Sequence, residues 1–442
     1  MKQANEVLSR IQHGSLSPAQ VMTIAVCLII NMIDGFDIVV ISFVASEIAT
    51  EWALSPATLG VLFSAGLAGM TIGSLFISPM ADRFGRRPII LACLSITTVG
   101  MVASAFASTV NQLMLLRLLA GMGIGGILSS LIIMVAEYSP DDRRQFAITL
   151  SMIGFPIGAI VGGSLTVLLI GQFGWRAPFL AAGLCTLILI PAVLVFLPES
   201  LAFLLSRRAE NSLERINHIL LRMNKEAVGS LPEPPAVDGQ QSNRYAALFS
   251  AEFRHSTLYV WLIYFLGMLA MYFVLNWTPK LIFDAGLSRE QGIYSGIVIN
   301  VGALVGILVM SFLSLKVRMV SIIAGYMLCG AVAMIVFGAW HTELIVVMGL
   351  AFLIGFMINS CLVGMHALMP EVYPVQLRST GAGWAIGIGR LSAVIAPAVA
   401  GWLLANGVSS AMTFTIFAMP LILAALVVWW LLGARLNQQT TE

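Results

Sequence analysis

Two aspartates and two arginines of this 442-residue chain lie well inside long apolar stretches: Asp34, Asp37, Arg117 and Arg390. At the centre of a membrane helix, such a side chain costs at least roughly 2.5 to 3.5 kcal/mol, and that cost is normally tolerated for function. The residue types indicate two kinds of chemistry. A carboxyl group can take up and release a proton, and a guanidinium group can hold a carboxylate through two hydrogen bonds.

The two aspartates are the candidates for proton coupling. Asp34 and Asp37 are three residues apart, so they lie near one face of a helix. Burial raises the pKa of a carboxyl group whereas a nearby arginine lowers it, and a carrier can exploit that competition. Arg117 lies about 7 Å from the outer end of its predicted helix, at a depth in the membrane similar to that of Asp37. We predict that it pairs with Asp34 or Asp37 and with Glu137; the alternative for these residues is a purely structural ion pair.

Arg390 is the candidate for binding an organic anion. It lies roughly 14 Å from the cytoplasmic end of its apolar stretch, near the membrane midplane. A guanidinium group stays charged and matches a carboxylate with two parallel hydrogen bonds. A structural role in helix packing is the alternative.

Composition identifies the elements that must position these residues. Hydrophobic residues make up 59% of the chain and charged residues 10%, which a soluble domain could not bury. Windows of about 20 apolar residues, long enough to cross a bilayer, recur along the whole chain. We predict an all-α membrane protein with twelve transmembrane helices, at residues 20–45, 58–79, 89–109, 112–136, 145–170, 177–197, 257–279, 291–313, 319–340, 343–366, 381–405 and 411–433.

The basic residues predict the orientation. With the N-terminus in the cytoplasm, only Arg176, Lys280 and Arg289 fall in outer loops, and nearly all other lysines and arginines fall in cytoplasmic segments. The positive-inside rule therefore predicts both termini in the cytoplasm and an even number of spans. We expect this multi-pass protein in the cytoplasmic (inner) membrane. The first apolar stretch is too long for a signal-peptide core and is predicted to be a retained helix.

One long polar stretch divides the chain. It predicts an N-terminal six-helix bundle at 1–197, a cytoplasmic central loop at 198–256 and a C-terminal six-helix bundle at 257–442. Within the loop, residues 201–226 could form one or two short amphipathic helices on the membrane surface, and a solvated interdomain loop is the alternative. Residues 231–235 and 239–243 have the composition of a flexible linker.

The two halves share a short motif at equivalent places. Glu137 and Arg144 follow the fourth span and Glu371 and Arg378 follow the tenth, each pair in the pattern Glu-x-x-Pro-x-x-x-Arg. This repeat indicates two pseudo-symmetric halves that pivot about a central cavity. We predict a conformational role for these four residues.

A charged turn between the second and third spans is the next motif. It reads Asp82-Arg83-Phe-Gly85-Arg86-Arg87. Glycine permits the tight turn, and the aspartate can bind an arginine or a helix N-terminus. The cluster could latch one conformation; a basic loop that only fixes topology is the alternative.

The charged turn resembles the signature loop of the major facilitator superfamily. The segment from Arg117 to Gly126 resembles the fourth-helix motif of that superfamily, and Pro198-Glu199-Ser200 after the sixth span is also similar. This resemblance covers nearly the whole chain. It implies two pseudo-symmetric six-helix bundles and transport by alternating access.

A narrower resemblance rests on two blocks. Asp34-Gly-Phe-Asp37 in the first span and the Gly- and Trp-containing segment from Arg378 to Arg390 are similar to the aromatic acid:proton symporters, which include 4-hydroxybenzoate, benzoate and vanillate carriers. The resemblance implies import of a small aromatic carboxylate with a proton. Such a substrate needs apolar and hydrogen-bonding walls, for which the candidates at membrane depth are Phe36, Asn276, Trp277, Asn359 and Trp384. For Trp277 an interfacial aromatic belt is the alternative, and for Asn359 the alternative is a hydrogen bond that joins helices.

Other functions lack their motifs. The sequence has no Gly-x-x-x-x-Gly-Lys-Ser/Thr loop for a nucleotide, no nucleophile and base pair, and no paired cysteine spacing. We therefore predict a transporter and not an enzyme, driven by the proton gradient, with no cofactor, metal or nucleic acid. The predicted partners are the aromatic acid, the proton and the lipid bilayer, and the family implies a monomer. Drug or organic-acid export and substrate sensing by a transporter-like receptor are the competing functions.

Overall fold

A computed structural model describes residues 16–207, 211–231, 247–340 and 343–432, and within these ranges every regular element is a helix. Twelve helical segments of the described chain are long and apolar enough to cross a membrane, which confirms the predicted fold class. Their ends differ from the predicted spans by no more than five residues. The agreement arises because a spanning segment must satisfy all its backbone hydrogen bonds internally, so an apolar stretch of that length has to be a helix.

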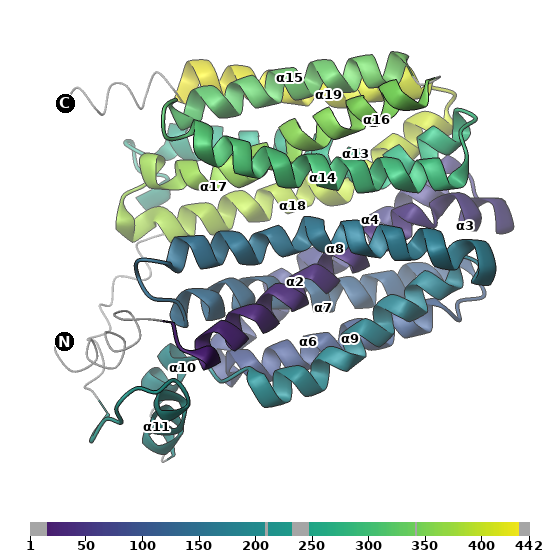
Figure 1. Cartoon of the computed structure of the whole chain (residues 1–442). Helices are drawn as coiled ribbons and strands as arrows, with labels where there is room; N and C mark the ends of the chain where they lie inside the picture. Colours follow the sequence, from purple (N-terminus) through teal and green to yellow (C-terminus); the bar gives the residue numbers. More distant parts are fainter. Residues whose placement is uncertain (1–15, 208–210, 232–246, 341–342, 433–442) are drawn as a thin grey trace. The chain divides into compact units, whose positions relative to one another are not determined.

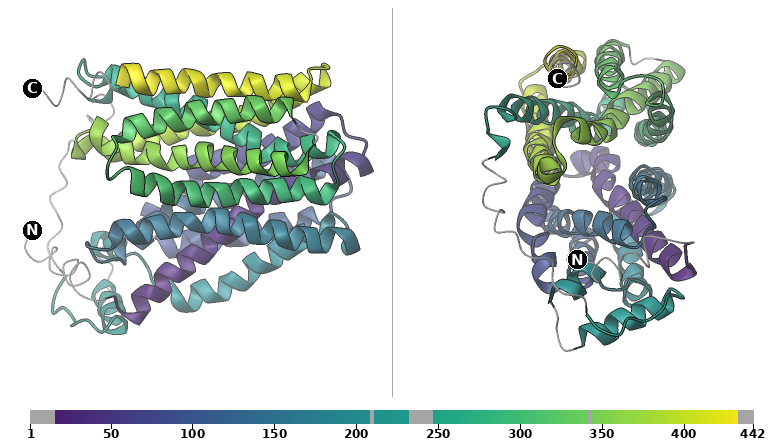
Figure 2. Two further views of the ribbon diagram at one scale, coloured as in Figure 1. Left: turned by 45° about the horizontal axis from the view of Figure 1, so that its top comes forward. Right: turned by 90° about the vertical axis from the view of Figure 1, so that its left-hand side faces the viewer.

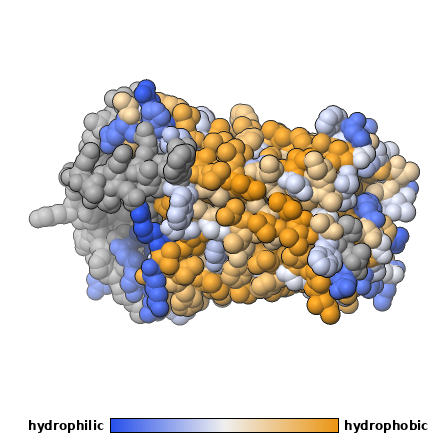
Figure 3. Space-filling view, turned by 90° about the horizontal axis from the view of Figure 1, so that it is seen from above, coloured by the Kyte–Doolittle hydropathy of each residue, from blue (hydrophilic) through white to orange (hydrophobic). Residues whose placement is uncertain are grey.

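The surface has the pattern that a bilayer requires. Figure 3 shows an apolar belt across the middle of one face, with hydrophilic residues gathered toward its two ends. Several of the helices that could cross a membrane are capped at their starts by hydroxyl groups. Ser288, for example, accepts from the Gln291 N–H at 3.2 Å while the Gln291 side chain accepts from the Ser288 N–H at 2.8 Å.

By its internal contacts the chain divides into two compact units, and each is described separately. Unit 1 contains residues 1–38, 68–158 and 179–238; unit 2 contains residues 39–67, 159–178 and 239–442. Helices α2 (Pro18–Phe43), α4 (Pro56–Ile72), α8 (Arg144–Phe173) and α9 (Arg176–Phe196) contribute segments to both units.

The remaining helices each belong to one unit. Those of unit 1 are the π-helical turn η1 (Gly73–Ile77), α5 (Met80–Phe84), α6 (Arg86–Ser104), α7 (Val110–Glu137), α10 (Leu201–Arg207) and α11 (Ser212–Arg222). Those of unit 2 are α3 (Ala45–Glu51), α13 (Arg254–Asp284), α14 (Arg289–Leu313), α15 (Met319–Ala339), α16 (Leu344–Ile354), the π-helical turn η2 (Gly355–Asn359), α17 (Ser360–Val372), α18 (Val375–Ala405), α19 (Ser410–Leu426) and the π-helical turn η3 (Val427–Leu432).

Glycines allow the helices of unit 1 to approach closely. Helix α7 packs along α6 (Figure 1) and also contacts η1. A Cβ atom on Gly125 of α7 would lie 2.0 Å from the carbonyl oxygen of Met70, and one on Gly69 would lie 2.0 Å from that of Leu118. Small residues at such backbone-to-backbone contacts are the usual basis of helix packing in membranes.

In unit 2, α13 pairs with α18 and α15 pairs with α19 (Figures 1 and 2). The indole of Trp277 on α13 donates to the Pro397 carbonyl of α18 at 3.1 Å. Residues 39–67 join this unit through side-chain hydroxyl groups. Ser42 donates to the carbonyls of Leu275 and Asn276, and Ser64 donates to that of Val394.

The central segment begins with two short helices, α10 and α11, where the sequence left both amphipathic helices and a solvated loop possible for residues 201–226. Ile216, Ile219 and Leu220 of α11 are buried in the core of unit 1, which explains its amphipathic pattern. Most of the predicted flexible linker lies outside the described residues. The predicted boundaries of the two bundles stay a prediction.

Candidate functional site

The two aspartates of α2 lie in the interior of unit 1. Asp34 is 2% exposed and Asp37 is fully buried. Among the described residues, three of their carboxylate oxygens have no hydrogen-bond partner: both oxygens of Asp37 and the Oδ2 of Asp34. An isolated charged carboxylate is costly in such a place, and a bound proton removes the charge. The arrangement can therefore take up a proton without first breaking a side-chain hydrogen bond of Asp37.

Arg117 reaches α2 as predicted, but through the main chain. Its Nη2 donates to the carbonyl oxygen of Asp37 at 2.7 Å, its Nη1 contacts the Met101 sulfur at 2.7 Å, and its guanidinium lies 5.7 Å from the Phe179 ring centroid. The sequence analysis missed Met101 and Phe179, because an apolar residue in an apolar span carries no signal of a partner.

The predicted pairing of Arg117 with Glu137 was wrong. The two residues are twenty positions apart on α7, which is about 30 Å along a helix. Glu137 instead forms an ion pair with Arg86 of the charged turn and accepts from the Ser200 hydroxyl at 2.7 Å.

Helix α2 is held against α8 at the level of the aspartates. A Cβ atom on Gly35 would lie 2.1 Å from the Phe155 carbonyl oxygen, and one on Gly158 would lie 1.7 Å from that of Met32. The Asn31 amide donates to the Ser151 carbonyl at 2.6 Å. Phe36, a predicted substrate wall, is 5% exposed within this packing.

The charged turn and the end of α7 form one network in unit 1. Arg86 joins Glu137 and Ser200, and the Glu199 carboxylate accepts from the N–H groups of Arg86, Arg87 and Ser200 at 2.8 to 3.3 Å. The Tyr138 hydroxyl donates to the Glu199 carbonyl at 2.6 Å, and burial raises the pKa of Tyr138 well above its usual value. This network combines three motifs that the sequence analysis had identified separately.

The remaining residues of the charged turn, together with Arg144, lie at the edge of this network. Asp82 is exposed and 3.9 Å from the guanidinium of Arg86. The Arg83 carbonyl accepts from Arg207, Arg87 donates to the Leu194 carbonyl, and Arg144 pairs with Asp141 at 2.5 Å. Gly85 has a φ of +102°, and a Cβ atom there would lie 2.5 Å from the Glu199 carboxylate, so both the turn and the network require glycine.

Arg390 lies in unit 2, where Tyr272 of α13 is its electrostatic neighbour. Helix α18 comes close to α13 here, since a Cβ atom on Gly389 would lie 2.6 Å from the Met268 sulfur. Asn276, one turn beyond Tyr272, is buried and donates to the Tyr272 carbonyl at 2.8 Å. The structure thus groups a guanidinium, a phenol and an amide on two adjacent helices, a set that can hold a carboxylate and a hydroxyl group.

The three remaining wall candidates differ in position. Trp277 is 1% exposed and contacts Phe63 edge-on at 5.4 Å, so it lies in the core of unit 2 and not in an interfacial belt. Trp384 is 47% exposed and stacks on Trp261 at 5.7 Å. It is six residues from Arg390, which places the two about 120° apart around α18. Asn359 ends the π-helical turn η2, a distortion often found at functional sites.

Three buried polar atoms of unit 2 are additional candidates for contacts with a bound molecule. Among the described residues, the hydroxyls of Tyr264 and Tyr326 and the Asn300 Oδ1 have no hydrogen-bond partner. Polar aromatics within apolar spans were the only sequence signal for the two tyrosines. The side chains of Glu371 and Arg378 lie outside the described residues. In the part of the chain that the structure describes, no cluster of three potential ligands could hold a metal ion.

Comparisons with known proteins agree with one another. The model of the Major Facilitator Superfamily matches residues 27–358. The chain is 33% identical to the gallate transporter of Pseudomonas putida, over 96% of this chain and 94% of that protein. It is 31% identical to the 4-hydroxybenzoate transporter PcaK of Pseudomonas aeruginosa, over 96% and 95%. Among solved structures, the xylose transporter XylE of E. coli in a partially occluded inward-open conformation has a TM-score of 0.73 at 17% identity, covering 93% of this chain and 98% of that one.

Proposed function

The chain belongs to the Major Facilitator Superfamily and is a multi-pass membrane transporter, and on this premise we propose that it imports a small aromatic carboxylate together with a proton. The observation that carries the proposal is the similarity over nearly the full length to carriers named for gallate and 4-hydroxybenzoate. Benzoate is named for a further relative, from Acinetobacter baylyi, at 27% identity. These substrates share a ring and a carboxylate, and most also carry hydroxyl groups.

The proposed substrate site is centred on Arg390. Its guanidinium would hold the carboxylate, with Tyr272 and Asn276 as neighbours able to bind a ring hydroxyl. In the same unit, Asn359 and Trp384 are proposed as further walls of the site, and Phe36 is proposed as a substrate contact contributed by unit 1. Trp277 supports α13 against α18 from the core, because its indole and ring are already engaged by Pro397 and Phe63.

The proposed proton site is the Asp34 and Asp37 pair. Both side chains are buried, and the Asp37 carboxylate has no hydrogen bond among the described residues. Arg117 stays attached to the carbonyl of Asp37 by a bond that does not involve the carboxylate. The Asp37 side chain can therefore change its protonation state without losing the contact that fixes its helix to α7.

The charge network around Arg86 and Glu137 is proposed to stabilise one conformational state. Its ion pair and the hydrogen bonds of Glu199 tie α6 and α7 to the segment after α9. Asp82, Arg83, Gly85, Arg87 and Arg144 surround it, and Glu371 and Arg378 are the proposed counterparts in the second half. We place both termini in the cytoplasm, the protein in the inner membrane as a monomer, and the driving force in the proton gradient without a cofactor.

Uptake by the purified protein in sealed vesicles tests the proposal. With an acidic exterior, labelled gallate, 4-hydroxybenzoate and benzoate are offered, and hydroxylated, methoxylated and non-aromatic acids compete. We expect accumulation that collapses on addition of a proton uncoupler and competition by aromatic acids alone. Transport of the acids only in the outward direction would instead indicate an exporter, and binding without flux would indicate a receptor. Either result contradicts proton-coupled import.

A further inference from the structure

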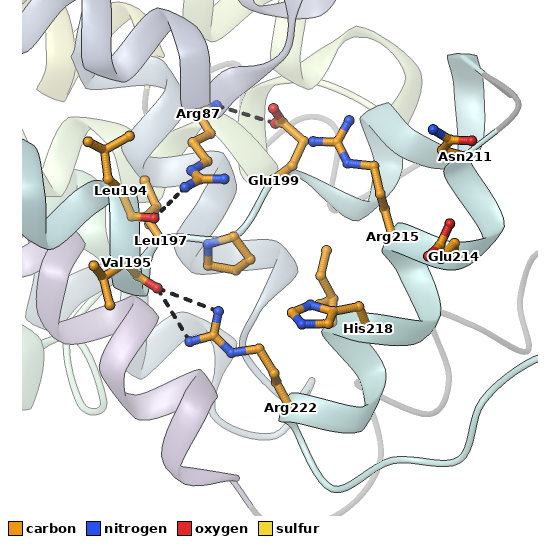
Figure 4. Close-up of a pocket in the computed structure, with 12 residues that line it drawn as sticks. Arg87, Leu194, Val195, Leu197, Glu199, Asn211, Glu214, Arg215, His218 and Arg222 are labelled. Carbon is orange, nitrogen blue, oxygen red and sulfur yellow. Dashed lines mark hydrogen bonds between the residues drawn. The ribbon is translucent and has the colours of Figure 1, made fainter.

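A basic cavity lies in unit 1 where α9 leaves the apolar region. It has a volume of about 370 Å³ and is bounded by the last turn of α9, the start of α6 and one face of α11. Figure 4 shows side chains from these elements around the opening, with Arg87 on one side and Arg215, His218 and Arg222 on the other. Neither the proposed substrate site nor the proposed proton site includes this cavity.

The sequence of α11 builds the basic side of the cavity. Arg215, His218 and Arg222 are spaced i, i+3 and i+7, so they share one face of the helix. The opposite face, with Ile216 and Leu220, is buried in the core of unit 1. The burial of that apolar face fixes α11 in rotation and holds the basic face toward the cavity.

The arginines have donors to spare. A guanidinium group carries five N–H donors. Arg87 uses Nη2 on the Leu194 carbonyl, and its Nε is buried with no hydrogen-bond partner among the described residues. Arg222 shares both Nη groups with the Val195 carbonyl at 3.4 and 3.5 Å. In the described part of the chain, no hydrogen bond or ion pair involves the side chain of Arg215.

The two carboxylates of the cavity do not neutralise it. Glu199 is already engaged by the main-chain N–H groups of Arg86, Arg87 and Ser200. Glu214 is exposed, one position from Arg215. Three guanidinium groups against two carboxylates leave a net positive site. Arginine forks of this kind match the oxygens of a phosphate group.

The apolar residues at the rim of the cavity favour a phospholipid over a soluble phosphate compound as the source of the phosphate group. Leu194 and Val195, on the last turn of the membrane helix α9, are 51% and 58% exposed, and Phe196 beside them is also exposed. A soluble phosphate compound would use the arginines but not this rim. A phospholipid would use both, with its phosphate among the arginines and its acyl chains along α9. Capping of the α9 carbonyls alone would explain Arg87 and Arg222 but not the unpaired Arg215.

We propose that the cavity between α6, α9 and α11 binds the phosphate group of an anionic phospholipid, with Arg215, Arg222 and Arg87 as the donors. The membrane would thereby hold the central segment next to Arg86 and Glu199 of the charge network. This proposal does not depend on the identity of the transported acid, because it concerns a different surface and a different ligand.

Native mass spectrometry of the full-length protein, titrated in detergent with phosphatidylglycerol or phosphatidylcholine, tests it. We expect phosphatidylglycerol to bind more tightly, and the R215Q/R222Q variant to bind it about tenfold more weakly. Arg215→Gln alone should give a smaller loss in a protein that folds normally, since Arg215 makes no intramolecular bond. Arg143→Gln is the matched control: it removes an exposed arginine from the loop before α8 and should leave lipid binding unchanged.

Three results would overturn the proposal. Equal binding of phosphatidylglycerol by the wild type and R215Q/R222Q would show that the lipid binds elsewhere. Displacement of the lipid by millimolar glycerol 3-phosphate or inorganic phosphate, together with tight binding of those ions, would assign the cavity to a soluble phosphate compound. Loss of binding in Arg143→Gln to the same extent would reduce the effect to overall surface charge.

Discussion

Arg117 donates a hydrogen bond of 2.7 Å to the main-chain carbonyl of Asp37, while the carboxylate of Asp37 has no hydrogen-bond partner among the described residues. The arginine is thus attached to the residue but not to its titratable group. It can anchor α7 to α2 whether Asp37 is charged or neutral. Protonation of Asp37 would still change its electrostatic attraction to Arg117, because the guanidinium group on α7 and the carboxyl group on α2 lie on two helices that are in contact.

We expect Asp37→Asn to uncouple transport from the proton gradient. The amide keeps the size of the side chain and leaves the Arg117 bond to the main chain in place, but it cannot take up a proton. With one proton carried per substrate, a gradient of one pH unit supports about tenfold accumulation, and the variant should show none. Exchange of labelled for unlabelled substrate across the vesicle membrane should continue.

Asp34→Asn and the double variant complete this measurement. The aspartate whose replacement alone abolishes accumulation is the coupling residue, and Glu252→Gln, an exposed acid in unit 2, controls for loss of one negative charge. Accumulation by the double variant at the wild-type level would exclude both aspartates from coupling.

Replacement of Arg390 should weaken substrate binding. Arg390→Lys keeps the charge but loses the planar fork, and Arg390→Gln loses both, so we expect KM to rise about tenfold for lysine and further for glutamine. Tyr272→Phe should discriminate between acids, with a larger loss for hydroxylated than for unsubstituted benzoates. Initial rates of uptake and equilibrium binding of labelled acid measure these changes.

Lys316→Gln provides the matched control, because it removes an exposed cation from the same unit. A normal KM in Arg390→Gln would exclude Arg390 from the binding of the carboxylate. If binding falls equally for a non-acidic analogue, Arg390 stabilises the helices instead of the substrate.

The sequence predicted where the helices begin and end better than it predicted which atoms form hydrogen bonds with one another. Twelve spans followed from apolar length alone, and the depths of Asp37 and Arg117 followed from a constant rise per residue. Depth does not say which atom a guanidinium will meet. The bond from Arg117 goes to a carbonyl, which every residue has, so no residue type could have indicated it.

The sequence also did not predict which residues of distant segments pair with each other. Glu137 was predicted to pair with Arg117 on its own helix but pairs with Arg86, and Ser200 links the two. Each of these residues belongs to a recognisable motif, yet the network depends on how three helix ends pack. Trp277 was ambiguous for the same reason, since its burial depends on the approach of α18.

Stability should depend on pH through Glu51 at the end of α3. Its carboxylate accepts from the Arg176 guanidinium at 2.9 and 3.2 Å and from the Trp175 indole at 2.6 Å. The hydrogen bonds from Arg176 hold the pKa of Glu51 below its ordinary value of 4.5. A lowered pKa in the folded state stabilises the protein above the ordinary value, and the effect disappears as pH falls through the lowered value.

We therefore expect Glu51→Gln to lower the Tm at pH 7 by about 1 °C, since exposed ion pairs contribute little. The difference from wild type should shrink as the pH falls below the ordinary pKa of 4.5. Scanning calorimetry in detergent between pH 3.5 and 7.5 measures it, with the exposed Glu343→Gln as control. A difference in Tm that stays constant over this range would contradict a contribution from the charged form of Glu51.

Gly158→Ala tests whether the aspartate-bearing helix must lie directly against α8. An added Cβ would lie 1.7 Å from the Met32 carbonyl oxygen, and because that contact is backbone, the helices would have to separate. Overpacking of this kind costs about 1 to 3 kcal/mol. We expect a lower Tm and a loss of transport greater than the loss of substrate binding, since Asp34 and Asp37 would move while Arg390 would not. Gly171→Ala on the same helix, where a Cβ meets nothing within 4 Å, should behave as wild type, and equal effects of the two substitutions would contradict the requirement for close contact.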